Sequence, residues 1–192
     1  MSNVRRQLAF SLIEMLVALI VFSIGLLSIA GLQTVSKQAN YEAVQRTTAS
    51  QVANGLLEDM RLNGDAINVY LGAGTLGGGS RGNEPAPNCS GGAPCTAAQK
   101  ATHDLWRWEQ MLDGNLETAN GVGAGGLVQP SLCINGPIGG GAGIYRVTIA
   151  WRGGASLTDS VNDACGALSG NYGAGNEFRR IMQIPTFIDP TI

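Results

Sequence analysis

Residues 8–30 read LAFSLIEMLVALIVFSIGLLSIA, and no charged residue follows Glu14 until Lys37. This run of about twenty uncharged, mostly apolar residues is long enough to cross a ~30 Å hydrocarbon layer as a helix. Arg5 and Arg6 precede it, and basic residues flanking a membrane span favour the cytoplasmic side. The sequence therefore predicts a single-pass membrane anchor with a cytoplasmic N-terminus and an exported C-terminal domain.

Glu14 is a charged residue at the start of this apolar run. A carboxylate deep in a bilayer costs about 2–3 kcal/mol. One interpretation places Glu14 near the lipid headgroups, where its carboxylate reaches water. In the other interpretation, Glu14 pairs with a positive group of a second chain. A buried carboxylate beside an ammonium is tolerated, whereas burying either charge alone costs much free energy.

Residues 8–16, with the short basic leader before them, resemble the class III signal of type IV prepilins and pseudopilins. In that family a small residue, usually glycine and here Ala9, precedes the cleavage site, phenylalanine follows it, and glutamate lies four positions further on. The resemblance implies that prepilin peptidase cleaves between Ala9 and Phe10 and that the new Phe10 amine is N-methylated. It also implies that Glu14 meets the N-terminal amine of a neighbouring subunit during assembly.

An ordinary secretory signal is the alternative. Ser28-Ile29-Ala30 offers small residues at a spacing that suits signal peptidase. However, the apolar stretch is longer than a normal signal core, Glu14 interrupts it, and the helical pattern continues past Ala30. These features favour the prepilin interpretation.

The helical pattern extends through residues 33–63, which contain no proline and only one glycine, Gly55. Apolar residues recur there at three- and four-residue steps, as on one face of an amphipathic helix. Asn63-Gly64 is a helix stop signal. We therefore expect one helix from Phe10 to Asn63, about 80 Å long at ~1.5 Å per residue.

These features predict four segments. They are a prepilin leader (1–9), a transmembrane half of the helix (10–35), an amphipathic half (36–63) and a periplasmic or extracellular globular head (64–192). An ordinary anchor followed by a separate core helix would need a helix breaker near residue 35, and the sequence has none there.

Several stretches resemble the PilV-type minor pilins, the type IV pilus modification proteins. They are residues 31–34, 38–40, 53–61 and 145–153, together with Cys133 and Cys165. The resemblance implies a type IV pilin fold and a structural role in pilus initiation, assembly and adhesion. Its implied partners are prepilin peptidase, other minor pilins, the major pilin and the lipid of the bacterial inner membrane. A minor pseudopilin of a type II secretion system carries the same signal and is the alternative within this class.

The four cysteines, Cys89, Cys95, Cys133 and Cys165, suggest two disulfides in an oxidising compartment. Three pairings are possible, and proximity together with the PilV resemblance favours Cys89–Cys95 and Cys133–Cys165. The absence of a C-x-x-C pair and the single histidine, His103, argue against a zinc site.

The remainder of the chain predicts an α+β head. Its expected elements are an irregular segment (64–95), a helix (96–116), strands (127–134, 144–151 and 178–184) and an extended tail (185–192). A small antiparallel sheet, joined by glycine-rich loops, should pack on the second half of the long helix. Residues 72–77 match G-x-G-x-x-G but lack the strand and helix of a dinucleotide site, so we interpret them as a loop.

The helix expected at residues 96–116 carries the side chains that could suggest a ligand site. We expect Trp106 and Trp108 to serve packing, because each ring buries a large area. His103 is interpreted as a surface histidine, and Asp104 and Glu109 as carboxylates without partners. The sequence thus offers no catalytic, cofactor-binding or metal-binding constellation.

The formal net charge is −2, with 14% charged residues, so there is no basic surface to attract nucleic acid. Two functional classes remain. The first is a structural pilus subunit that is not an enzyme. The second is a periplasmic ligand-binding domain, either soluble after cleavage at Ala30 or tethered by its helix.

Mass spectrometry of the mature N-terminus separates these classes. A chain that begins at N-methylated Phe10 is the expected result. A chain that begins at Gly31 would instead indicate secretion, and an unprocessed Met1 would indicate a simple tether.

Overall fold

Helix α1 (Leu12–Leu62) is the longest element of the chain. The computed structural model describes residues 11–90, 94–120, 122–123, 125–157 and 163–191, and the chain divides into two units, residues 1–41 and 42–192. The helix lacks the interior proline that would end it, and it starts and stops close to the expected Phe10 and Asn63. The helix therefore continues past residue 35 without interruption, as predicted.

The hydroxyl groups in the apolar part of α1 are satisfied within the helix itself. Ser23, Ser28 and Thr34 each donate to the carbonyl oxygen four residues earlier, at 2.6, 2.9 and 3.1 Å. An unsatisfied polar group is costly in an apolar environment. These internal bonds let the segment lie in lipid without polar partners from elsewhere.

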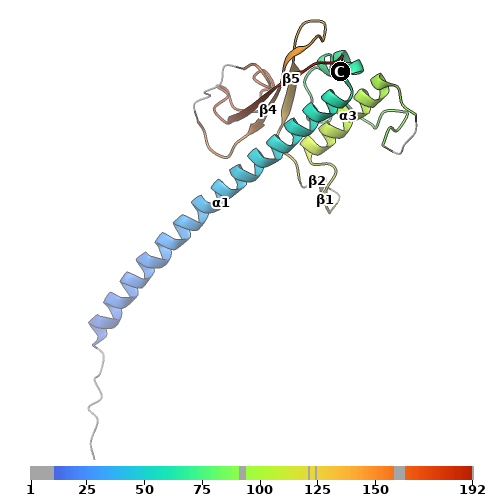
Figure 1. Ribbon diagram of the computed structural model, residues 1–192. Coiled ribbons are helices and arrows are strands. Elements are labelled where there is room, and N and C mark those ends of the chain that lie inside the picture. Colours follow the sequence, from blue (N-terminus) through green and yellow to red (C-terminus); the bar gives the residue numbers. More distant parts are fainter. Residues whose placement is uncertain (1–10, 91–93, 121, 124, 158–162, 192) are drawn as a thin grey trace, which may run out of the picture. The chain divides into compact units, whose positions relative to one another are not determined.

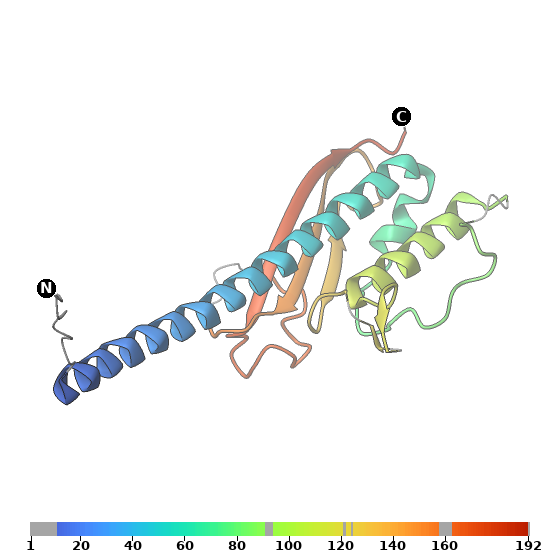
Figure 2. The same cartoon turned by 90° about the horizontal axis from the view of Figure 1, so that it is seen from below.

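In the C-terminal unit (residues 42–192), the second half of α1 packs on a three-stranded antiparallel sheet (Figure 2). The strands are β3 (Ser131–Asn135), β4 (Gly143–Arg152) and β5 (Arg179–Ile188), in the order β3-β4-β5. In register, Val147 of β4 lies between Ile134 and Ile184. The core contains, from α1, Ala49, Val52, Ala53, Leu56, Leu57 and Met60, and from β4, Tyr145, Val147, Ile149 and Trp151. The predicted α+β class is confirmed.

Helix α3 (Ala97–Asp113) lies on the other side of α1 from β4 and β5 (Figure 1). Thr96 begins it with a capping box, in which the Thr96 hydroxyl accepts from the Gln99 N–H and the Gln99 side chain accepts from the Thr96 N–H. Gly114 ends it at φ 75°, a left-handed conformation that favours glycine. The helix therefore stops before Leu116, the expected end.

Helices α1 and α3 approach each other closely at Gly55. A Cβ atom at Gly55 would overlap the six-membered ring of Trp108. The indole Nε1 of Trp108 donates to a carboxylate oxygen of Asp59 at 2.7 Å, and the Arg107 guanidinium binds the same oxygen at 2.6 Å. The predicted packing role of Trp108 is thus borne out, and Gly55 is the residue that makes room for it.

The acidic side chains of α3 hold the segment that precedes it. Asp104 accepts a hydrogen bond from the Tyr70 hydroxyl at 2.8 Å. Glu109 is fully buried and accepts from the backbone N–H groups of Gly77 and Arg81, at 2.8 and 2.7 Å. The expectation that Asp104 and Glu109 lack partners is wrong, because their partners lie about 30 residues earlier in the sequence, in a short helix for Asp104 and in a loop for Glu109.

His103 is also buried, with 4% of its surface exposed, and its Nε2 lies 3.2 Å from a carboxylate oxygen of Glu84. The surface interpretation of His103 is therefore wrong.

The burial of Tyr70 raises the pKa of its phenol, and the hydrogen bond to Asp104 raises it further, while a hydrogen bond from Asn63 opposes the shift.

The segment expected to be irregular contains short helices. These are η1 (Gly64–Ala66), a 3₁₀ turn, and α2 (Ile67–Leu71), whose Ile67 and Tyr70 enter the core. The loop after α2 is tied to the sheet, since Leu76 and Leu132 exchange two backbone hydrogen bonds. Residues 72–77 are accordingly a loop, and it is anchored at Leu76.

The strand bounds differ from the expected ones at both ends of the sheet. Strand β3 begins at Ser131 instead of Leu127, and β5 continues through Pro185 to Ile188. A proline lacks an N–H donor but is tolerated in an edge strand, and β5 is such a strand. A small hairpin of β1 (Thr118–Ala119) and β2 (Val122–Gly123) follows α3.

The outer face of the sheet is partly covered by the segment that contains Cys165 and Tyr172. The Tyr172 hydroxyl donates to the Gln129 carbonyl at 2.8 Å and lies 3.1 Å from the Ser131 hydroxyl. Thr148 on this face is fully buried, whereas Arg146, two residues earlier, is exposed. The segment with Cys165 and Tyr172 therefore shields the half of the outer sheet face that contains Thr148 and leaves the half that contains Arg146 exposed to solvent.

The contact between Gly55 and Trp108 predicts the effect of a substitution. Gly55→Ala should destabilise the C-terminal unit by about 1–3 kcal/mol, because the added methyl group overpacks the interface, although alanine is intrinsically the better helix former. Thermal unfolding of the full chain in detergent, followed by tryptophan fluorescence, measures this effect.

Gly31→Ala is the matched control, because nothing lies within 4 Å of a Cβ at Gly31. It should leave the unfolding temperature unchanged. A Gly55→Ala chain as stable as the parent would contradict the close-packed interface.

Candidate functional site

The candidate site lies at the beginning of α1. The expected cleavage residues, Ala9 and Phe10, lie outside the described residues. Ser11 precedes the helix, and the backbone N–H of Glu14 donates to its hydroxyl oxygen at 3.3 Å. Glu14 thus occupies the third position of the first turn, where a carboxylate is stabilised by the partial positive charge of the helix N-terminus.

Apolar side chains surround Glu14 on the helix surface. A shallow hollow is lined by Glu14 together with Ile13, Val17, Ala18, Val21 and Phe22. Within the described residues no basic side chain lies within ion-pair distance of Glu14. The described part of the chain therefore offers this carboxylate a helix terminus but no counter-charge.

The large apolar side chains from Leu12 to Val35 are exposed over about half or more of their surface. Helix α1 contains a stretch that is long and apolar enough to cross a membrane. Apolar surface of this extent is not left in water by a stable protein, and marks a site of contact with lipid or protein.

The structure contains two disulfides. Cys89 is bonded to Cys95, and Cys133 to Cys165, with Cα–Cα distances of 6.0 and 5.8 Å. The second bond joins β3 to the segment that covers the sheet. Closing a loop of that length stabilises a protein by about 3–4 kcal/mol on the chain-entropy model.

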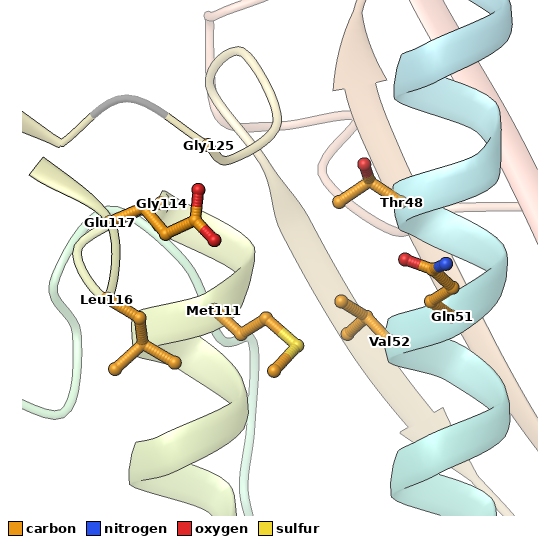
Figure 3. Close-up of a pocket in the computed structure, with 8 residues that line it drawn as sticks. All are labelled: Thr48, Gln51, Val52, Met111, Gly114, Leu116, Glu117 and Gly125. Carbon is orange, nitrogen blue, oxygen red and sulfur yellow. The ribbon is translucent and has the colours of Figure 1, made fainter.

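A second candidate feature is a groove between α1 and the end of α3 in the C-terminal unit (Figure 3). Its volume is about 270 Å³. Thr48, Gln51 and Val52 of α1 point into it from one side, and Met111, Leu116 and the carboxylate of Glu117 line the other. Sequence reasoning missed this groove, because its lining comes from three segments that no local pattern connects.

The described residues contain no group of three or more His, Cys, Asp or Glu side chains that could hold a metal ion. The buried carboxylates of α3 are each engaged by protein donors, as described above. Their arrangement stabilises the fold and presents no group to a substrate.

Two family models match adjoining parts of the chain. The prokaryotic N-terminal methylation motif matches residues 4–30, and the model described as type IV pilin Tt1218 matches residues 31–106. No curated protein and no solved structure matches the chain. The methylation motif includes Ala9, Phe10 and Glu14, and it implies processing by prepilin peptidase and assembly with other pilins. Such families are structural and not enzymatic, so the two matches make the chain similar to type IV pilins over residues 4–106 and indicate a pilus-related structural subunit.

Proposed function

We propose that this chain is a minor pilin that takes part in the initiation and assembly of a type IV pilus and supports its adhesion. Prepilin peptidase cleaves it between Ala9 and Phe10, and the Phe10 amine is then N-methylated. Its partners are other minor pilins and the major pilin. The PilV-like stretches in residues 31–61 and 145–153 support this finer assignment within the type IV pilins.

One observation carries the proposal: Glu14 lies in the first turn of an exposed apolar helix without a counter-charge in the described residues. In a fibre, the N-terminal ammonium of a neighbouring subunit supplies that charge. An ammonium and a carboxylate that are both removed from water stabilise each other, and removing one of them leaves the other at a cost of about 3–5 kcal/mol. The pair therefore favours assembled subunits over misaligned ones.

The membrane holds the subunit before assembly. Arg5 and Arg6 favour a cytoplasmic N-terminus, and residues 10–35 span the inner membrane in the proposed topology. Residues 36–63 form the amphipathic half of the helix, and residues 64–192 form the exported head. An oxidising compartment suits the two disulfides of this head.

Substitution of Glu14 tests the proposal and separates charge pairing from helix capping. Glutamine can replace glutamate in a capping box, but it carries no charge. If pairing is the role, both Glu14→Gln and Glu14→Ala should remain in the membrane fraction yet fall at least about tenfold in sheared fibres, because the neighbour's ammonium is left unpaired. Quantitative immunoblots of the two fractions measure this ratio.

Glu58→Gln is the matched control, since Glu58 is an exposed carboxylate on the same helix, paired only with Arg61. It should enter fibres at the parental level. Normal incorporation of Glu14→Gln would reject the pairing role of Glu14.

A further inference from the structure

The groove between α1 and the end of α3 contains a carboxylate without a partner among the described residues. Glu117 lines the groove, and no hydrogen bond or ion pair from the described part of the chain reaches its side chain. Figure 3 shows this carboxylate beside Gly125, across the groove from Thr48 and Gln51. The charge of the groove is therefore complementary to a cationic group.

The remaining lining of the groove is mostly apolar. Val52 of α1 is fully buried there, and Met111 and Leu116 on the opposite side are 37% and 54% exposed. Lysine and arginine carry a positive group on a long apolar stem, which packs against apolar surface while the charged end stays in a polar setting. One such side chain matches both parts of the lining.

The wall of the groove that contains Gly125 is held in place on both sides. The Gln45 side chain donates to the Gly126 carbonyl at 3.3 Å and accepts from the Val128 N–H at 3.1 Å, which ties this segment to α1. The Leu127 N–H donates to the Leu112 carbonyl at 2.8 Å, which ties it to α3. A preformed groove spares its occupant the cost of ordering the protein.

The size of the groove favours a side chain over a free ligand. Its volume of about 270 Å³ is below the ~300–1,000 Å³ of typical small-molecule sites. A free cation would also lose its translational freedom on binding. A side chain that belongs to an already aligned neighbour loses much less, because its effective concentration at the groove is high.

We propose that the groove receives the side chain of a lysine or arginine from a different pilin, with Glu117 paired to its charge and Met111 and Leu116 against its stem. This inference rests on the proposed function, in which the neighbours are other minor pilins and the major pilin. Thr48, Gln51 and Val52 belong to α1, the helix along which those neighbours are aligned. The groove thus names the chemistry of a contact between this head and an unlike subunit.

Photo-cross-linking of the full chain tests this contact. A photoreactive phenylalanine analogue at Leu116, on the edge of the groove, should cross-link to a different pilin in sheared fibres. Mass spectrometry should map the product to a segment with a lysine or arginine within a few residues. A cross-link only to a second copy of this chain, or to a segment without a basic residue, would overturn the proposal.

Changes of charge at residue 117 supply the second measurement. Glu117→Gln should lower the cross-link yield about two- to fivefold, as expected for an exposed ion pair, and Glu117→Lys about tenfold, because like charges then face each other. Replacing the mapped basic residue with glutamate should restore the yield of the Glu117→Lys chain. Asp65→Asn is the control, because Asp65 is an exposed acid outside the groove. Yields that do not respond to Glu117→Lys, or no recovery in the paired variant, would refute the ion pair.

Filling the groove tests the occupant by shape. Thr48→Phe should lower the cross-link yield at least about tenfold, because the ring would take the space of the incoming stem. Thr47→Phe makes the same change one residue earlier on α1, at an exposed position that does not line the groove, and should leave the yield near the parental level. Equal losses in the two variants would contradict a contact through the groove.

The failures of the two proposals are distinguishable. If the parental chain is absent from fibres, the proposed function is wrong and this contact falls with it. If the chain is present in fibres but the analogue at Leu116 cross-links to no other pilin, only the present inference is wrong.

Discussion

A carboxylate that enters an apolar environment needs a positive partner, and the described part of this chain gives Glu14 none. The constraint is severe because the same helix that carries Glu14 exposes an unbroken apolar surface, which only lipid or other helices can cover. The described part of the chain thus lacks both a counter-charge for Glu14 and a cover for the apolar surface of the helix. The proposed assembly into a fibre answers both needs at once, since it pairs Glu14 with the neighbour's amine and covers the apolar surface with neighbouring helices.

The two halves of α1 meet different demands through different residues. In the first half, the hydroxyls of Ser23, Ser28 and Thr34 bond to the helix's own carbonyls, so the surface offered to lipid or to other helices is effectively apolar. In the second half, small residues and Gly55 let α3 and the sheet pack closely. The buried acids of α3 then fix the glycine-rich loop through its backbone N–H groups. Loop residues with little propensity for regular structure thereby become part of a defined head.

The sequence predicted those features that depend on local pattern. The long helix followed from an apolar run and an amphipathic period without a breaker, and the α+β class followed from the alternation in residues 144–151. Helix α2 was missed because five residues carry too little periodicity. The burial of His103 and the partners of Glu109 could not be predicted, since they depend on contacts between α3 and residues 77–84. The continuation of β5 through Pro185 was also not predicted, because a proline is acceptable in a strand only at the edge of a sheet, and that position is not evident from the sequence.

Zero-length coupling tests the central claim most directly. A membrane-permeable carbodiimide joins a carboxylate to an amine only when the two are in contact. Treatment of intact fibres, followed by mass spectrometry, should yield a peptide containing Glu14 of this chain bonded to the N-terminal amine of another pilin. Recovery of Glu14 without such a bond, while other carboxylate–amine pairs of the fibre are coupled, would contradict the account.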